Sequence, residues 1–316
     1  MSSGAVTAEF AAGVRGLAEA ELPDEVDRVA RDSLLMAIAG AIGASAHPAV
    51  ERAVAVWSDH GGQPEVPVLG RRERLDLLGA TVANGAAAYA GGQADPLMRP
   101  AWAPTSMAAA LGLGYVLDVS GAEVLRAFAL GREVQARLAR GLKADEGHPW
   151  NDAAVCAPVG CAVTAGLLLE LDDDRMRTAM GIAAAQLLGH REVDGTMIEP
   201  YLVGKGAANG VHAALLAQDG LTGATTVLEH VRGFFAVIAP ERGDPASVLE
   251  DLGDRWLLLE GVPPADADAR TQVARIVDPV LPAGGAEVLI DAVGELGAAT
   301  SVRALIEAGT RREGAA

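Results

Sequence analysis

Three segments of this chain are apolar on almost every face, and they restrict the fold more than any other feature. They cover residues 153–169, 176–188 and 207–217. A helix without a polar face is stable only when it is buried in the centre of a protein or in an oligomer interface. The pattern therefore predicts an all-α fold, in which other helices pack around a hydrophobic central hairpin.

The core around these helices has to be built from small side chains. Half of the 316 residues are hydrophobic, but only 3% are aromatic and 38 are glycine. Small residues allow helix backbones to approach closely, which suits a compact bundle of buried, Ala/Gly-rich helices. The two cysteines, Cys156 and Cys161, lie in one of the apolar segments, and we expect them to be buried, reduced thiols.

Local signals predict where several helices begin. Ser120 and Glu123 have the spacing of a capping box, which opens a helix towards residue 140. Acidic residues at 172–174 favour a second helix start, and Asp244-Pro245 predicts a short helix. Short extended segments are expected at residues 64–69 and 256–259.

The acidic balance of the chain limits its partners. The formal net charge is −17 at pH 7, which repels nucleic acid and anionic membrane surfaces, so neither is expected to bind. No basic stretch precedes an apolar one at the N-terminus, and a cytoplasmic protein is expected. The sequence has no Cys/His cluster of the zinc type and no glycine-rich phosphate loop, so we expect no metal and no cofactor.

One segment carries a family motif. Residues 194–210 read DGTMIEPYLVGKGAANG. They resemble a segment of the MmgE/PrpD family that reads approximately G-T-M-x-K-P-(Y/F)-H-V-G-K-A-A-x-N-G. The similarity continues at the A-N-G run of residues 83–85, at His148-Pro149 and at 252–256, and it covers residues 5 to 262. The family includes 2-methylcitrate dehydratase, cis-aconitate decarboxylase and iminodisuccinate epimerase.

The resemblance implies a domain organisation. Residues 1–262 match the family's helical domain, which forms homodimers, so a homodimer is expected. Members usually continue into a second α+β domain that helps to close the active site. Here residues 263–316 are expected to form a short, mostly helical segment in its place, with that second domain absent or reduced.

The family's reactive residues are largely replaced in this chain. The motif's Lys and His fall on Glu199 and Leu202, and a later family Lys falls on Asp278. In the loop after the A-N-G helix, the family's His falls on Tyr89 and only Asp95 is retained from its aspartates. A following His falls on Arg99, whereas His148 keeps its place in the H-P pair.

These positions supply the candidate site residues. We predict catalytic roles for His148, Asp95, Glu199 and Tyr89, and substrate-binding roles for Arg99, Tyr201, Lys205 and Trp102. Histidine and carboxylate side chains are suitable general acids and bases near neutral pH. Five of them have a simpler alternative: His148 as a helix cap, Asp95 and Arg99 as a solvated ion pair, Glu199 as a surface acid, and Lys205 as a helix-packing residue.

Three functions remain open on the sequence. The lost positive charges favour an enzyme that dehydrates, isomerises or cyclises a small neutral or hydrophobic substrate, because desolvating a carboxylate beside unpaired acids is unfavourable. The second is a non-catalytic relative that acts as a binding or partner protein. The third is a conventional di- or tricarboxylate lyase that holds its substrate with Arg99 and Lys205.

Overall fold

Two of the three apolar segments lie in central helices, since 153–169 forms α7 and 207–217 lies within α9. The third, 176–188, begins in α8 (Asp173–Ala184), which is only partly buried, whereas the buried helices α4 and α5 were not among the predicted segments. The computed structural model describes residues 5–92, 102–145, 147–260 and 269–311. Helices α4, α5 and α7 are buried along nearly their whole length, and α9 packs along both α4 and α7. Their bounds are α4 Leu77–Gly92, α5 Trp102–Leu117, α7 Asp152–Leu168 and α9 Ile198–Gln218. The fold is all-α, as expected.

Glycines bring these helices into close contact. A Cβ atom on Gly204 of α9 would lie 2.2 Å from the carbonyl oxygen of Val82 in α4. A Cβ on Gly210 of the same helix would lie 2.6 Å from the carbonyl oxygen of Pro158 in α7. The backbones approach closely because no side chain separates them, which is the packing that the small-residue composition predicts.

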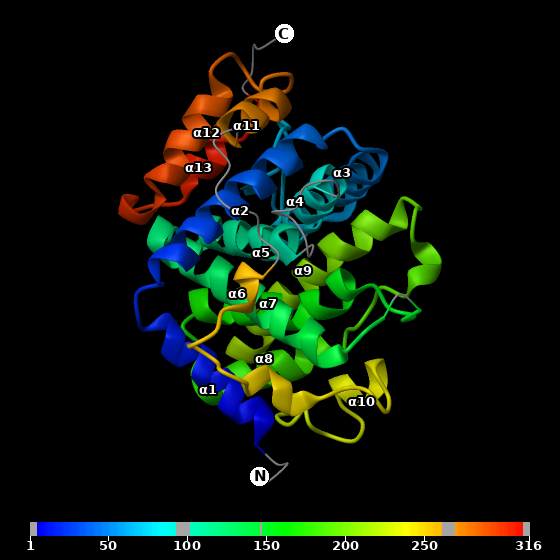
Figure 1. Ribbon diagram of the computed structural model, residues 1–316. Coiled ribbons are helices and arrows are strands. Elements are labelled where there is room, and N and C mark those ends of the chain that lie inside the picture. The colour runs from blue at the N-terminus through cyan, green and yellow to red at the C-terminus, as the bar shows by residue number, and fades with distance from the viewer. Residues whose placement is uncertain (1–4, 93–101, 146, 261–268, 312–316) are drawn as a thin grey trace.

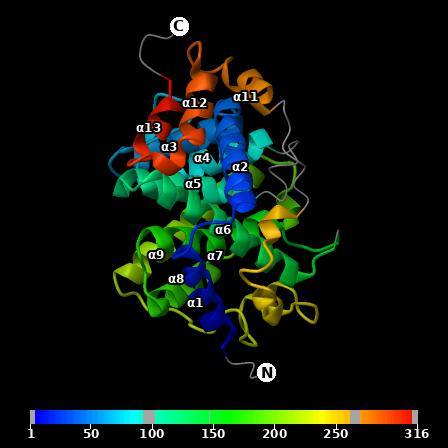
Figure 2. The same cartoon turned by 60° about the vertical axis from the view of Figure 1, so that its left-hand side comes forward.

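The remaining helices cover this layer and extend it at both ends. Their bounds are α1 Val6–Ala18, α2 Asp24–Gly43, α3 Pro48–His60, α6 Gly121–Leu142, α8 Asp173–Ala184, α10 Phe234–Ile238, α11 Ala269–Val277, α12 Gly285–Gly294 and α13 Arg303–Ala308. Helices α1, α8 and α10 lie at one end of the molecule, and α11, α12 and α13 lie at the other, beside α2 (Figure 1). The turned view shows the same arrangement (Figure 2).

The C-terminal helices belong to the same hydrophobic core as α2. Helices α11 and α12 pack against α2. Val273, Val277 and Leu289 are completely buried in one cluster with Leu34 and Ile38 of α2. Residues 269–311 are therefore joined to the helical layer by apolar packing.

Several predicted helix starts are confirmed. Ser120 and Glu123 form the expected capping box at the start of α6. Asn151 caps α7, and Asp172 caps α8 by accepting a hydrogen bond from the Arg175 backbone N–H. Asp244 precedes a short 3₁₀-helix, η3 Pro245–Leu249, but its side chain pairs with Lys143 instead of capping that helix. Further 3₁₀-helices are η2 Arg191–Val193 and η5 Leu296–Ala298.

One of the two extended segments is confirmed and the other is not. Val66–Pro67 forms strand β1, which pairs with β2 Arg74–Leu75 in an antiparallel hairpin. By contrast, residues 256–259 contain a 3₁₀-helix, η4 Leu257–Leu259. The buried carboxylate of Glu133 on α6 accepts the backbone N–H groups of Leu257 and Leu258, at 3.1 and 2.9 Å, and so holds this turn.

No single helix in the described ranges is both long and apolar enough to cross a membrane. Helices α2 and α3 reach the required length and apolar character only when taken together, and they are bent by 81° at the break between them.

Candidate functional site

Tyr89 and Glu199, two of the predicted catalytic residues, are in contact. The Tyr89 hydroxyl in the last turns of α4 donates a hydrogen bond of 2.7 Å to Oε1 of Glu199 in the first turn of α9. The Tyr89 ring is 8% exposed and packs against Ala153 and Ala154 at the start of α7. Three helix ends therefore meet around one phenol and one carboxylate.

Both oxygens of the Glu199 carboxylate have a hydrogen-bond donor. While Tyr89 donates to Oε1, the backbone N–H of Gly195 donates to Oε2 at 2.7 Å. Gly195 has a φ of 77°, a left-handed conformation that glycine adopts without strain, and this turn directs its N–H at the carboxylate. Glu199 is therefore held in place, which argues against its alternative as a free surface acid.

The Tyr89 hydroxyl is a proton donor throughout the neutral pH range. Burial of the ring, followed by its hydrogen bond to Glu199, raises the pKa of Tyr89 well above its ordinary value of 10. The Asn151 side chain opposes this rise, and the negative charges of Glu199 and Asp194 add to it. The phenol thus remains protonated and donates hydrogen bonds, whereas the carboxylate accepts them.

His148 is buried between two backbone carbonyl groups. Its Nε2 lies 3.2 Å from the carbonyl oxygen of Ile238 in α10, and its Nδ1 lies 3.4 Å from that of Trp150. The side chain therefore links the loop before α7 to α10. It does not cap α7, because Asn151 does so, and the helix-cap alternative for His148 is wrong.

Asp152 lies close enough to His148 for their charges to interact, and one of its carboxylate oxygens lacks a hydrogen-bond donor among the described residues. Burial raises the pKa of its carboxyl, and the charges of His148 and Arg191 oppose that rise. Its Oδ1 is buried without a hydrogen-bond partner among the described residues. Asp152 therefore adds a second partly buried acid, at the start of α7, where Tyr89 packs.

Tyr201 and Lys205 lie on other faces of α9. Tyr201 packs against Ala53 and Trp57 and lines an apolar groove of 560 Å³ between α3 and the start of α9. The Lys205 ammonium donates a 2.7 Å hydrogen bond to Asn209 Oδ1, and burial lowers the pKa of this half-buried lysine. The described contacts do not join either side chain to the Tyr89–Glu199 pair, and their substrate-binding roles stay predictions.

The other three predicted residues lie between positions 95 and 102 of the sequence. Asp95 and Arg99 fall outside the described residues. Trp102, the first residue of α5, is 7% exposed and packs against Ala136 of α6 and Leu257 of η4. Its indole N–H is buried with no hydrogen-bond acceptor in the described part of the chain.

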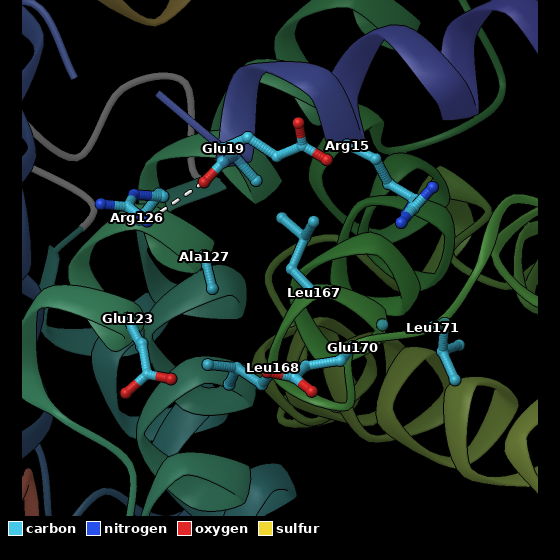
Figure 3. A pocket seen from close by; sticks show the side chains of 11 residues that line it. Arg15, Glu19, Glu123, Arg126, Ala127, Leu167, Leu168, Glu170 and Leu171 are labelled. Carbon is cyan, nitrogen blue, oxygen red and sulfur yellow. Dashed lines mark hydrogen bonds between the residues drawn. The ribbon is translucent and has the colours of Figure 1, made fainter. Parts of the chain in front are cut away.

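A separate pocket lies between α1, α6 and the end of α7 (Figure 3). Its volume is 330 Å³, and none of the eight predicted site residues lines it. Arg15 pairs with Asp173, Glu123 belongs to the α6 capping box, and Arg126 donates to the carbonyl oxygen of Ala18. Arg15 and Arg126 therefore join α1 to α8 and α6, whereas Glu123 is engaged within α6.

Sequence reasoning did not assign Gly195 and Asp194 to the site region. Gly195 belongs to the G-T-M motif, and its glycine was the available signal for a special backbone turn. Asp194 acts through its charge on Tyr89. Among the described residues, no group of three or more His, Cys, Asp or Glu side chains is arranged to hold a metal ion.

Comparison with known proteins agrees with the helical fold. The family model described as the MmgE/PrpD N-terminal domain matches residues 8–245. Human cis-aconitate decarboxylase is 29% identical over 74% of this chain, and cis-aconitate decarboxylase from Aspergillus terreus is 28% identical over 73%. The cis-aconitate decarboxylase-like protein oryM from Aspergillus oryzae is 27% identical over 80%.

The match is limited to part of each relative. It covers 50% of the human protein, 49% of the Aspergillus terreus protein and 56% of the Aspergillus oryzae protein, so this chain spans about half the length of the curated relatives it matches. The family model nevertheless covers three quarters of this chain, from the first helix to η3. The chain therefore belongs to the MmgE/PrpD family.

Proposed function

We propose that this protein is a lyase- or isomerase-type enzyme that acts on a small molecule whose reacting part is neutral or apolar. The observation that carries the proposal is the hydrogen bond between Tyr89 and Glu199, a phenol and a carboxylate at the end of the central helix layer. A buried donor beside an acceptor is the minimal pair for moving a proton without a cofactor.

The pair suits chemistry next to a carbonyl group. A substrate carbonyl oxygen that accepts the hydrogen bond of Tyr89 releases Oε1 of Glu199 to take a proton from the adjacent carbon. The phenol stabilises the negative charge that develops on that oxygen. Returning the proton to a different carbon completes an isomerisation. Transfer of the proton to a departing β-hydroxyl, which leaves as water, completes a dehydration.

The surrounding charges support a neutral reacting group. Glu199, Asp194 and Asp152 bring acidic side chains to this junction, on a chain of net charge −17. A polycarboxylate in the same place would add negative charge to a partly desolvated acidic site, which is unfavourable.

Glu199→Gln is the direct test. The variant keeps the side-chain shape but loses the base, so we expect kcat/KM to fall by about 10²–10⁴ on neutral β-hydroxy or unsaturated carbonyl compounds. Glu192→Gln, an exposed neighbour in η2, serves as the matched control and should keep full activity. Equal activity of the wild type and Glu199→Gln would disprove the assignment of the base.

A carboxylate lyase is the second candidate, because the curated relatives are named cis-aconitate decarboxylase. It predicts release of CO₂ or water from small polycarboxylates and no turnover of the neutral set. If the wild type turns over neither set, the remaining interpretation is a family member that binds a ligand or partner without catalysis.

A further inference from the structure

Arg132 is a buried cation with unsatisfied hydrogen-bond donors in the described part of the chain. It lies in the middle of α6, its side chain is 1% exposed, and its Nε and Nη1 atoms have no hydrogen-bond acceptor among the described residues. Burial lowers the pKa of Arg132 to about 10, so the guanidinium is still positively charged at neutral pH. Buried charges are normally paired, because an unpaired one is strongly destabilising.

Arg137 on the same helix shows how this protein normally satisfies a buried guanidinium. It is also fully buried, and it pairs with Glu133 at 2.7 Å. It further donates to the backbone carbonyl groups of Val248 and Glu250, at 3.0 and 2.8 Å. Glu133 is engaged by Arg137 and by the turn at Leu257, so its carboxylate is not free to pair with Arg132.

Trp102 supplies a second buried donor, and it packs on the face of α6 that carries Arg132. Its indole ring packs against Ala136, which lies one helical turn after Arg132 on the same face of α6. Its Nε1 also has no acceptor in the described ranges. Apolar side chains lie beside both donors, since the Arg132 guanidinium lies 5.6 Å from the ring centre of Phe128 and Trp102 contacts Leu257.

We propose that Arg132 and Trp102 bind the carboxylate group of a small organic acid. All the orphaned atoms are donors, so their ligand must be an acceptor, and the uncompensated charge requires an anion. A carboxylate presents two oxygens and one negative charge, which fits a guanidinium and one indole N–H. Inorganic phosphate carries more charge and more oxygens than these two side chains satisfy. The apolar surroundings favour an acid whose remaining part is hydrophobic.

This carboxylate site is made of residues other than Tyr89 and Glu199. The inference therefore stands whether or not the proposed chemistry is right. If both hold, the substrate is an acid with one carboxylate as an anchor and a neutral reacting part elsewhere.

Thermal unfolding of the full chain with matched small ligands tests the site. Propionate is the probe, propionamide its neutral isostere, and sodium chloride at equal ionic strength the salt control. We expect propionate alone to raise the Tm of the wild type. Arg132→Met should abolish this shift. Trp102→Phe, which removes the indole N–H together with part of the ring, should weaken propionate binding about tenfold, as expected for the loss of a charge-assisted hydrogen bond.

The unliganded variants give an independent result. Arg132→Met removes an unpaired buried charge, so its Tm without ligand should equal or exceed that of the wild type. Arg137→Met, the matched control, should lower the Tm because it breaks a fully satisfied buried network. Glu199→Gln should leave the propionate shift unchanged, which separates this site from the proposed catalytic pair.

Three outcomes would overturn the inference. The first is an equal propionate shift in the wild type and in Arg132→Met. The second is destabilisation of Arg132→Met as severe as that of Arg137→Met, which would show that Arg132 already has an acceptor within the protein. The third is a response to phosphate or propionamide that matches the response to propionate.

Discussion

Glu199 shows how one replaced side chain changes the chemistry that a retained backbone offers. The motif around it keeps the glycine, whose left-handed turn presents an N–H to the side chain at position 199. In the family pattern that side chain is a lysine, whereas here it is a carboxylate that accepts from both Gly195 and Tyr89. The same local geometry thus holds an acceptor in place of a cation.

Asp152 gives the stability of the protein a pH dependence with a definite sign. Burial raises the pKa of its carboxyl above the ordinary 3.8, so the folded protein holds this proton more tightly than the unfolded chain does. The free energy of unfolding should therefore fall as the pH rises from about 4 through the raised pKa. Asp152→Asn should remove this fall and stabilise the protein at pH 7 by about 1 kcal/mol.

The measurement is the Tm of the wild type and of Asp152→Asn between pH 4 and 8. Asp59→Asn, at an exposed position of α3, is the control and should follow the wild type. Parallel curves for the wild type and Asp152→Asn would contradict the prediction.

At the scale of elements, the contact between α4 and α9 depends on glycine. A Cβ on Gly204 would lie 2.2 Å from the carbonyl oxygen of Val82 and 2.8 Å from the backbone nitrogen of Ala86. Both atoms belong to the backbone, so only a displacement of one helix relieves the clash. The same two helices carry Tyr89 and Glu199, so their spacing also sets the geometry of the pair.

Gly204→Ala should therefore reduce both stability and activity. We expect a loss of about 1–3 kcal/mol in the free energy of unfolding, as for other overpacked contacts. Denaturant unfolding measures it. Gly16→Ala in α1 is the matched control, because a Cβ there meets nothing within 4 Å, and it should stabilise the helix by up to about 1 kcal/mol. An unchanged Gly204→Ala would show that α9 does not approach α4 this closely.

At the scale of the molecule, residues 269–311 should unfold together with the helical layer. Leu289 of α12 is completely buried in the cluster that contains Leu34 of α2, whereas its neighbour Val288 is 56% exposed. Leu289→Ala should cost about 2–5 kcal/mol, and Val288→Ala should remain within about 0.5 kcal/mol of the wild type. Calorimetry should show one cooperative transition for each protein. A separate early transition confined to the C-terminal helices would show that they form an independent unit.

The buried central helices bear on the assembly of the protein. Apolar helices require burial either inside one chain or between chains. Helices α4, α5 and α7 are covered by other helices of the same chain, so their apolar surfaces are buried without a second chain. The homodimer that the family resemblance implies stays a prediction.

Much of the fold follows from the sequence because its determinants are local. Apolar residues on every face of a helix require a central position, and the capping box at Ser120 and the N-cap at Asp172 act within one helical turn. The family motifs also marked positions 89 and 199 as candidate site positions. These features need no knowledge of the distant parts of the chain.

The tertiary structure decided what depends on contacts between distant residues. Tyr89 and Glu199 are 110 positions apart, and only the packing of α4 against α9 makes them a pair. Residues 257–259 form a 3₁₀-helix because Glu133, 124 positions earlier, binds their N–H groups. Arg132 and Arg137 occupy one helix and have the same side chain, yet Arg137 pairs with Glu133 whereas Nε and Nη1 of Arg132 have no acceptor among the described residues. From the sequence, α7 and α9 could be predicted as buried helices, because apolar residues on every face are a local property, but α4 and α5 were not singled out. The burial and pairing of each polar group were decided by the tertiary fold, because its neighbours come from other helices.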